Sequence, residues 1–410
     1  MKICIVNHYA ITPKQAGGTR HHTFAKELVK RGHKVTIVAS SFEHYTRKEV
    51  HLRAGETYKY ENIEGVDYIW LRTPGYQGNT IFRLFNMLSF SYKVRFYLPK
   101  LCSYVPEVII GSSPHPFSSL AAERLAAFWG VPFVFEVRDL WPQTLVDLGN
   151  LSPHHPLVIL LSLIEKYLYL RADHVITLLP GAADYINQKT SRKVPVSWIP
   201  NGIDLSMVPP PKPPVNSEKF SLVYAGSHGL ANQLSILLEV ARILQEQQPK
   251  TQIFFRLFGD GPEKPLLKKR AREFGLTNLV FEDPVPKEEL YKKLQEADGF
   301  IAILKDSPLY KWGISMNKLL DYMAAARPIV LGVGASLVYN PVEEARAGFT
   351  VPSNDAKAIA QAVVRLAQMP VKERWEMGLR ARRYIEKHYR IEYLVDKLEE
   401  VMVSLRGSET

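Results

Sequence analysis

Short apolar runs alternate with helical patterns through residues 1–200. The runs that predict buried strands read KICIVN, KVTIVAS, YIWLR, EVIIGSS, PFVFEV, HVITLL and VSWIP. Between them, at residues 23–31 and 120–128, apolar side chains recur at the three- and four-residue spacing of a helix. Strands that alternate with helices in this way predict a parallel sheet with helices on both faces and right-handed crossovers.

The alternation stops at residues 201–219 and then resumes. The sequence there, NGIDLSMVPPPKPPVNSEK, is rich in proline and polar residues and has no period, which is typical of a linker. After it, FSLVYAG, IFFRLFGDG, LVFEDPV, GFIAIL and PIVLG predict the strands of a second sheet. We therefore predict an α/β chain with two doubly wound, Rossmann-like domains, 1–200 and 220–385, that face each other across a cleft. Residues 386–410 are expected to form a helix that packs back on the N-terminal domain.

The charge of the chain is positive and uneven. Lys and Arg number 52 against 41 Asp and Glu, a net charge of +11, and residues 1–100 hold sixteen of the basic and seven of the acidic side chains. Such a surplus attracts phosphate groups, whether on nucleic acid, an anionic membrane or a diphosphate-linked small molecule. Because the basic residues form no known nucleic-acid reading motif, we expect no nucleic-acid partner.

Cysteine content and the length of the apolar runs bear on location. Cys4 and Cys102 are the only cysteines, too few for a disulfide framework or a cysteine-based zinc cluster, and they fit a reducing compartment. The N-terminal MKICIVNHY is too short an apolar stretch for a signal peptide. The longest apolar run, 156–164, is about half of the ~20 residues that a membrane span needs. We expect a cytoplasmic protein, with contact at the inner face of a membrane left open.

Residues 81–100, IFRLFNMLSFSYKVRFYLPK, offer one route to such contact. The segment mixes aromatic side chains with Arg83, Lys93, Arg95 and Lys100, and it contains no acid. A basic, aromatic helix can lie on an anionic membrane or hold a lipid-linked phosphate. The alternative is that the same stripe packs on its own domain.

Residues 313–331, GISMNKLLDYMAAARPIVL, predict a helix that packs on a sheet. The apolar positions between Met316 and Ala324 fall on one helical face, and the strand PIVL follows. Ser315 or Asn317 can cap the start of this helix.

The polar residues of that helix suggest a nucleotide site. The first turn carries Lys318 and no acid, which favours an anion such as phosphate at the helix N-terminus. Asp321 lies one turn further on and can accept hydrogen bonds from the hydroxyls of a ribose. The alternative is an ordinary surface ion pair between Lys318 and Asp321.

The first strand–helix turn carries Gly17 and Gly18, at the edge of an open sheet where ligands usually bind. Two adjacent glycines let a backbone approach a phosphate or a sugar closely, although a flexible surface loop would look the same. A dinucleotide-binding site is not expected. No third glycine follows at the required spacing, and the second strand ends at 38–41 in VASS, without the acid that would hold a cofactor ribose.

Several motifs in a fixed order point to a family. They read RADHVITLLPGA, WIPNGIDL, YAGSHG, LFGDGPEKPLL, NLVFEDPVPKEEL and the pair Ala297-Asp298, followed by the helix at 313–331. This series resembles the retaining glycosyltransferases of family 4, which have the GT-B architecture, over nearly the whole chain. EVRDLWPQTLVDLG at 136–149 is similar to a segment of the branch that builds bacterial surface polysaccharides and O-antigens.

The resemblance implies a nucleotide-sugar donor, a UDP-sugar in this branch, bound by the C-terminal domain. The family's hallmark is a pair of glutamates with seven residues between them; Asp321 stands at the second position and Gly313, without a side chain, at the first. Backbone N–H groups near 314–317, or another residue, would then take over the role of the first glutamate. The phosphate cations that the family usually offers after the first strand of this domain are absent, so Lys318 and Lys305 would supply the charge. The donor-binding residues implied in this way are Gly17, Gly18, Gly226, Ser227, Lys305, Met316, Asn317, Lys318, Leu319 and Asp321.

The resemblance also implies an acceptor, a saccharide or lipid-linked saccharide, bound by the N-terminal domain. Its candidates for catalysis are His115 in SSPHP and the pair Arg138 and Asp139 after PFVFEV, each at a strand end; Asp139 can orient or deprotonate an acceptor hydroxyl. The alternatives are a solvated loop histidine and a structural Arg–Asp pair. His8, at the end of the first strand, is a further candidate.

The resemblance therefore implies transfer of a hexosyl group in polysaccharide biosynthesis, with retention of configuration at the anomeric carbon. The leaving diphosphate needs stabilisation, and no Asp-x-Asp metal motif occurs in the chain, so we predict metal-independent transfer supported by Lys318, the helix N-terminus and the glycines of the first turn. Two alternatives share the architecture: a nucleotide-sugar 2-epimerase or hydrolase, and a non-catalytic nucleotide-sugar-binding protein, which Gly313 and the missing cations suggest.

Overall fold

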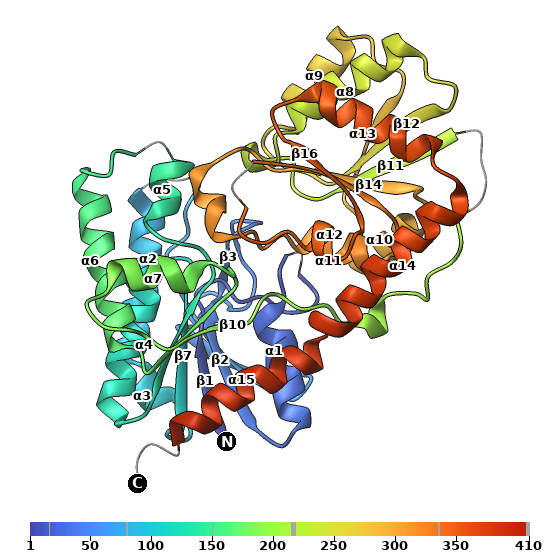
Figure 1. Cartoon of the computed structure of the whole chain (residues 1–410). Coiled ribbons are helices and arrows are strands. Elements are labelled where there is room, and N and C mark those ends of the chain that lie inside the picture. The colour runs from blue at the N-terminus through green and yellow to red at the C-terminus, as the bar shows by residue number, and fades with distance from the viewer. Residues whose placement is uncertain (16, 79–80, 150, 215–218, 335–336, 407–410) are drawn as a thin grey trace. The chain divides into compact units, whose positions relative to one another are not determined.

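The protein divides into two compact units. The computed structural model describes residues 1–15, 17–78, 81–149, 151–214, 219–334 and 337–406. Unit 1 comprises Met1–Asn201 together with the C-terminal residues from Ile391 onwards, and unit 2 comprises Gly202–Arg390 (Figure 1). Each unit has its own sheet and its own apolar core. The prediction of two Rossmann-like domains is confirmed.

Unit 1 is built on an eight-stranded sheet in the order β10-β9-β8-β7-β1-β2-β6-β5. Its strands are β1 (Lys2–Val6), β2 (Lys34–Ser40), β5 (Tyr58–Ile63), β6 (Val66–Leu71), β7 (Val108–Ser112), β8 (Phe133–Val137), β9 (His174–Thr177) and β10 (Val196–Trp198). All neighbours pair in parallel except β5, which pairs antiparallel with β6 at the edge of the sheet. A small hairpin joins β3 (Phe42–Glu43) to β4 (Lys48–Glu49). The strand order reverses beside β1, the position where ligands bind in open α/β sheets.

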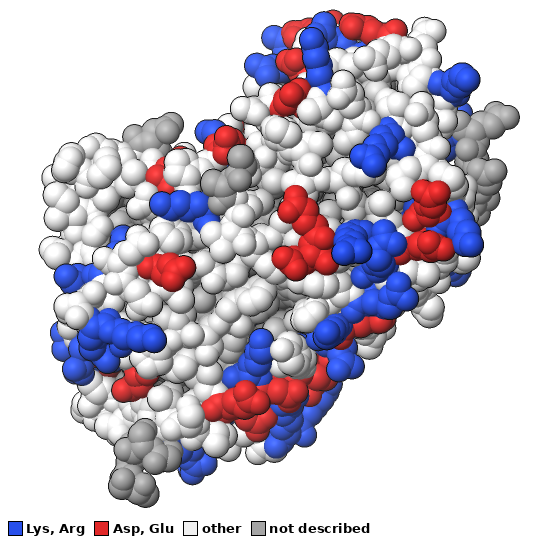
Figure 2. Space-filling model, in the orientation of Figure 1, with Lys and Arg blue, Asp and Glu red and all other residues white. Residues whose placement is uncertain are grey.

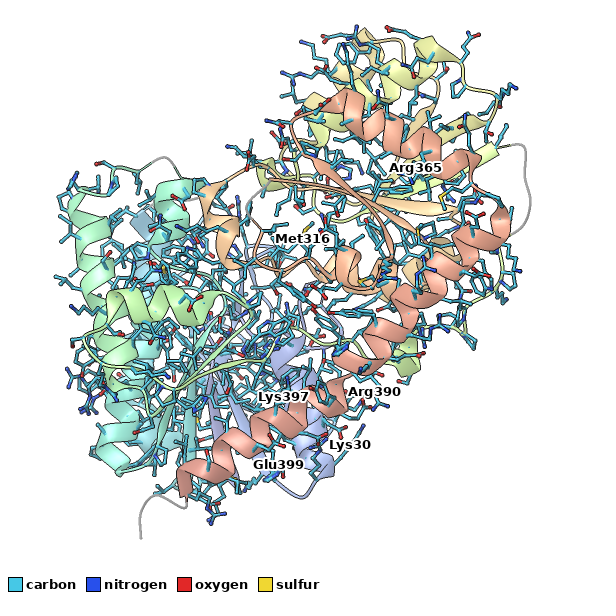
Figure 3. All side chains as sticks on the ribbon, viewed as in Figure 1. Lys30, Met316, Arg365, Arg390, Lys397 and Glu399 are labelled. Atoms are coloured by element: carbon cyan, nitrogen blue, oxygen red, sulfur yellow. The ribbon has the colours of Figure 1, made fainter. Side chains whose placement is uncertain are left out.

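Helices cover both faces of this sheet. They are α1 (Arg20–Lys30), α2 (Ile81–Phe96), α3 (Leu98–Leu101), α4 (Pro116–Trp129), α5 (Gln143–Asp147), α6 (Pro156–Arg171), α7 (Ala182–Lys189) and α15 (Ile391–Arg406). Helix α15 lies against α1, where the Arg31 guanidinium donates to Asp396 at 2.6 Å and to Glu399 at 2.9 Å. Leu394 and Leu398 are buried in the same core as the first strands, so the last helix belongs to unit 1 (Figure 3, where Glu399 is labelled). Helix α4 packs between α2 and α6 and against β7 and β8.

Unit 2 is built on a six-stranded parallel sheet in the order β13-β12-β11-β14-β15-β16. Its strands are β11 (Lys219–Ala225), β12 (Gln252–Phe258), β13 (Leu279–Glu282), β14 (Gly299–Ile303), β15 (Ile329–Val333) and β16 (Gly348–Pro352). Its α-helices are α8 (Leu234–Gln247), α9 (Lys264–Glu273), α10 (Lys287–Gln295), α11 (Asn317–Ala324), α12 (Pro341–Glu344), α13 (Ala356–Gln368) and α14 (Val371–His388). Short 3-10 helices occupy Leu205–Met207 (η1), Leu230–Asn232 (η2) and Pro308–Trp312 (η3). The order reverses between β11 and β14, which marks the ligand-binding edge of this sheet.

The proline-rich segment differs from the expected free linker. Ile203 and Val208 are buried in the core of unit 2, and the Ile203 N–H donates to the Tyr389 carbonyl at 2.9 Å. The Arg327 guanidinium donates to the Lys212 carbonyl at 3.0 Å. Unit 2 therefore begins at Gly202 and ends at Arg390, beyond the predicted bounds of 220–385. Composition predicted irregular backbone here, but the burial of two apolar side chains depends on contacts with residues far along the chain; residues 215–218 lie outside the described part.

Candidate functional site

Helix α11 begins at the ligand-binding edge of unit 2, but not with the predicted cap. Its N-cap is Met316, whose side chain makes no capping hydrogen bond, so neither Ser315 nor Asn317 holds the cap position. Met316 lies on the loop before α11 and packs on the core (Figure 3). The first turn carries no acid, as the sequence indicates. No carboxylate of the first turn therefore neutralises the positive end of the α11 helix dipole.

Lys318 is the central cation of this edge. Its ammonium donates to the Tyr224 hydroxyl at 2.8 Å and to Asn232 Oδ1 at 2.5 Å, and it lies 4.4 Å from the centre of the Tyr224 ring. Among the described residues, no carboxylate forms an ion pair with it. Burial lowers the pKa of Lys318 to about 7. An ammonium has three N–H donors, so one remains to bind an anion.

The alternative of a Lys318–Asp321 surface pair is wrong. Asp321 Oδ1 instead accepts from the Tyr291 hydroxyl at 2.8 Å and lies 3.6 Å from the Lys287 ammonium. The Asp321 side chain is 15% exposed, and burial raises its pKa. Within the described chain Oδ2 accepts no hydrogen bond, so this carboxylate retains the capacity to bind hydroxyl groups.

The loop after β11 packs directly on Lys318. Gly226 has φ +157°, and a Cβ atom there would lie 2.9 Å from Lys318 Cε. Its N–H donates to the Phe258 carbonyl at 3.0 Å, and the Ser227 carbonyl accepts from the Tyr224 hydroxyl at 2.7 Å. Because Gly226 has no side chain, the Lys318 side chain can pack against its backbone. Ser227 contributes the carbonyl that orients the Tyr224 hydroxyl.

Two further predicted donor residues, and the glycine at the position of the missing glutamate, have clear positions. Leu319 is buried in the core of unit 2, and its N–H donates to the Met316 carbonyl at 3.0 Å, so its contribution is packing. Lys305 is exposed at the end of β14, where its backbone N–H donates to the Ala231 carbonyl at 2.9 Å. Gly313 ends η3 with φ +110°, a conformation that L-residues adopt only under strain. The loop at 313 therefore has a backbone suited to glycine, and a glutamate there would require a different conformation.

A buried histidine pair lies at the ligand-binding edge of unit 1. His8 follows β1 and His115 caps α4; His8 Nδ1 lies 2.7 Å from His115 Nε2. Both side chains are buried, which contradicts the alternative of a solvated loop histidine at position 115. Burial, with the nearby Arg83, lowers the pKa of His115 to about 3. The two rings are therefore neutral at physiological pH, and one donates to the other.

Arg138 and Asp139 follow β8 at the same edge. The Arg138 N–H donates to Ser113 Oγ at 2.9 Å, and Asp139 is exposed. In the part of the chain that the structure describes, the two side chains form no ion pair, so a structural Arg–Asp pair is not the reason for these residues. Gly17 has φ +138° and packs with its Cα towards Ile11, while its neighbour Gly18 is exposed.

A buried charged network beside these residues was missed by the sequence analysis. Glu136 accepts from Arg20 Nε at 2.9 Å, lies 2.6 Å from His21 Nε2 and accepts from Ser112 Oγ at 2.5 Å. The same guanidinium donates to the Ile199 carbonyl at 2.9 Å. His21 and Arg20 hold the pKa of Glu136 well below its usual value, against the effect of burial. A charge inside the apolar run PFVFEV was the available signal.

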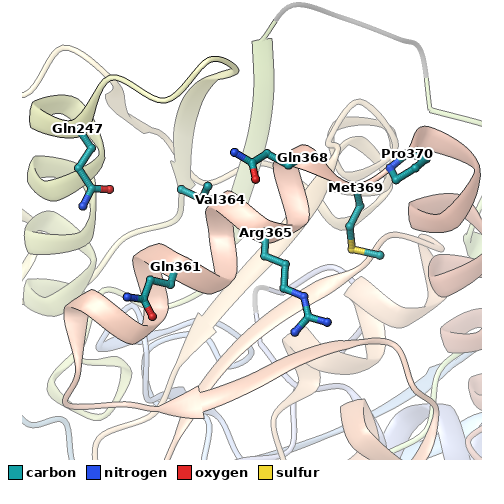
Figure 4. Close-up of a pocket in the computed structure, with 7 residues that line it drawn as sticks. All are labelled: Gln247, Gln361, Val364, Arg365, Gln368, Met369 and Pro370. Carbon is teal, nitrogen blue, oxygen red and sulfur yellow. The ribbon is translucent and has the colours of Figure 1, made fainter.

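A separate hollow lies on unit 2, between α8 and α13 (Figure 4). It is lined by Gln247, Gln361, Val364, Arg365, Gln368, Met369 and Pro370. None of the predicted site residues lines it. Among the residues that the structure describes, no group of three or more His, Cys, Asp or Glu side chains is placed to hold a metal ion.

Comparisons with known proteins agree with this architecture. Residues 16–202 match the family described as Glycosyl transferase 4-like domain, and residues 219–369 match Glycosyl transferases group 1. WcaI of Escherichia coli (strain K12), named as a colanic acid biosynthesis glycosyl transferase, is 24% identical over 296 residues, which is 68% of each chain.

Solved structures share the fold. Sucrose-phosphate synthase of Thermosynechococcus elongatus aligns over 100% of both chains with a TM-score of 0.75 and 15% identity. Anabaena HepE, in complex with UDP and glucose, aligns over 98% of this chain and 100% of its own with a TM-score of 0.67 and 13% identity. Two glycosyltransferase domains in this order, on two Rossmann-like units, make the protein a glycosyltransferase of the GT-B type.

Proposed function

We propose that this glycosyltransferase moves a hexosyl group from a UDP-sugar to a hydroxyl of a saccharide or lipid-linked saccharide, with retention at the anomeric carbon. The reaction would serve the synthesis of a surface polysaccharide, in keeping with the similarity to WcaI. The UDP preference is supported by the HepE complex with UDP and glucose. Retention and membership of family 4 rest on the sequence resemblance.

The proposal rests mainly on the environment of the Lys318 ammonium. An ammonium held by Tyr224 and Asn232, without a carboxylate partner in the described chain, lies at the edge of the sheet where ligands bind. As the bond between the sugar and the diphosphate breaks, negative charge grows on the phosphate oxygens. A preorganised cation there stabilises the leaving group more than the bound substrate, which is the condition for faster reaction.

Asp321 is assigned to the ribose. Tyr291 fixes one carboxylate oxygen, and the second oxygen accepts the ribose hydroxyls. The N-terminus of α11 and the backbone at 314–317 take the place of the missing glutamate side chain towards the sugar. Lys305, Met316 and Asn317 complete the donor residues of unit 2 in this assignment. The donor role of Gly17 and Gly18, which lie in unit 1, stays a prediction from the sequence.

The acceptor half is assigned to unit 1. Asp139 is exposed and acts on the acceptor hydroxyl, while Arg138 orients it. The neutral His115 is fully buried and paired with His8, so we assign it a positioning role behind the acceptor residues and not a contact with the sugar. We propose that the protein works in the cytoplasm at the inner face of the membrane, where α2, residues 81–96, contacts lipid.

Calorimetric titration with UDP, GDP, ADP and dTDP tests the donor assignment. We expect UDP to bind and the others to bind more weakly. Absence of binding to all four would remove the transferase proposal.

Incubation with a panel of UDP-sugars distinguishes transfer from the two alternative activities. Slow hydrolysis that accelerates with acceptor supports transfer, acceptor-independent interconversion supports an epimerase, and binding without turnover supports the non-catalytic alternative that Gly313 favours.

A further inference from the structure

Helix α2 exposes a continuous apolar stripe to solvent. Ile81, Phe85, Leu88, Tyr92 and Phe96 follow one another at helical spacing and are 42–58% exposed. The opposite side of the helix, which includes Met87, Phe90 and Val94, is buried against the unit. The helix is therefore apolar on both sides. In a soluble protein a contiguous exposed apolar face marks an interaction site.

Helix α6 carries a second exposed apolar stripe, in its first two turns. Leu157, Ile159, Leu160 and Leu163 are 37–62% exposed, while Val158 and Leu161 face the core. No charged residue interrupts this part of the helix. In the part of the chain that the structure describes, no helix combines the length and apolar character needed to cross a membrane. Helix α6 packs on β8 of its own sheet, so the stripe is the exposed side of a packed helix.

Helix α4 joins the two stripes into one surface. It packs between α2 and α6. On the α2 side, the Arg95 guanidinium lies 5.6 Å from the ring centre of the exposed Phe128 of α4. On the α6 side, the Arg124 guanidinium of α4 lies 5.3 Å from the ring centre of Tyr167. We call the outward side chains of α2, α4 and α6 the three-helix face.

The charged side chains exposed on the three-helix face are all positive, and two of them, Arg124 and Arg171, also pair with the buried Glu123 carboxylate at 3.5 and 3.0 Å. Helix α2 has no acid, and the acids of α4 and α6, Glu123 and Glu165, are each 2% exposed. Lys166 and Arg171 are exposed on the second half of α6, and Arg124 lies on the second half of α4. In Figure 2 the surface over α6 is mostly white, with blue Lys and Arg towards its lower end.

The apolar and basic residues are also ordered along the helices. In a parallel α/β sheet, helices begin at the edge where the strands end, which is the edge that carries His8, His115, Arg138 and Asp139. The first turn of α6 is apolar and that of α2 holds three apolar residues and Arg83, whereas the last turns carry Lys93, Arg95 and Arg171. The apolar end of the face is therefore the end nearest to the acceptor residues.

We propose that the three-helix face docks the protein on a bilayer surface that contains anionic lipids, with the α6 leucines inserted beside α2. Apolar side chains that enter the headgroup boundary, with cations that face lipid phosphates, are the two contributions that hold an amphipathic surface on such a membrane. The inference extends the contact proposed for 81–96 to α4 and α6. Only the role of this docking, which would be access to a lipid-linked acceptor, rests on the proposed function.

Flotation of the full chain with phosphatidylcholine vesicles, with and without phosphatidylglycerol, tests the docking. We expect the protein to float with the anionic vesicles and to be released by high salt, which screens the lysine and arginine charges. The double variant Leu160→Ser/Leu163→Ser should lower the partition coefficient about tenfold, because two partly inserted leucines are removed. Phe85→Ser/Tyr92→Ser on α2 should act similarly, and Arg124→Glu should weaken only the binding to anionic vesicles.

Leu266→Ser is the matched control. Leu266 is 49% exposed on α9, a basic helix of unit 2. The substitution therefore tests whether removing any exposed apolar side chain among cations lowers vesicle binding. We expect this variant to float like the wild type. Melting temperature and UDP titration should be unchanged in every variant, which separates this test from that of the donor site.

Three results would overturn the inference. The first is no flotation of the wild type with anionic vesicles. The second is flotation that the α6 substitutions leave unchanged. The third is a dimer, seen by light scattering, that the same substitutions dissociate while vesicle binding is absent; that would assign the face to a second copy of the chain.

Discussion

The pKa of Lys318 makes a sharp prediction about nucleotide binding. Burial lowers this pKa to about 7, so in the free protein the ammonium form falls from about nine tenths at pH 6 to about one tenth at pH 8. If only the ammonium binds the diphosphate, the Kd for UDP should rise about tenfold between these pH values, which is about 1.4 kcal/mol. Binding at pH 7 should also take up about half a proton.

Lys318→Met isolates this contribution. The variant lacks the charge-assisted hydrogen bonds to phosphate and should bind UDP about 1.5–3 kcal/mol more weakly at pH 6. Calorimetry in buffers of different ionisation enthalpy measures the proton uptake directly. The titration of UDP itself is common to both proteins, so the difference between wild type and variant reports on residue 318 alone.

Lys292→Met serves as the control, because Lys292 is an exposed lysine on α10 of the same unit. It should keep the wild-type affinity, pH dependence and proton uptake. The reasoning would be refuted if Lys318→Met retained the wild-type pH dependence and uptake. It would also be refuted if the affinity of the wild type, relative to that of Lys318→Met, increased with pH, since a deprotonating lysine can only lose attraction for an anion.

Three other predictions concern the remaining residues. Asp321→Ala should weaken UDP binding by about 1–3 kcal/mol but leave 2′,3′-dideoxy-UDP unaffected; equal losses for both ligands by calorimetry would reject the ribose assignment. Gly226→Ala should weaken UDP binding about tenfold, because the new methyl group meets Lys318 Cε at 2.9 Å; Gly275→Ala on a distant turn, also at positive φ, is the control for backbone strain. Asp139→Asn should keep UDP affinity but lower the transfer rate at least tenfold, and a parallel loss of both would contradict its role in activating the acceptor.

The strand–helix alternation was readable from the sequence because buried parallel strands are continuous apolar runs. KICIVN and GFIAIL are short, continuous apolar runs of this kind, and in the structure they form β1 and β14. The antiparallel β5 was not anticipated, since YKYENI alternates half-buried and exposed positions on a sheet edge and carries little apolar signal. Likewise, proline content predicted irregular backbone at 201–219 but not the burial of Ile203.

The sequence by itself determined the fold class and the position of Lys318 and Asp321 on one short helix, because periodicity and spacing are local properties. Only the tertiary structure decided what these residues contact. Lys318 meets Tyr224 and Asn232, 94 and 86 residues away, and Asp321 meets Tyr291. The same holds for α2 and α6, whose apolar side chains are not confined to one helical face in the sequence. Which of their faces is buried depends on long-range packing against the sheet, and no local pattern contains that information.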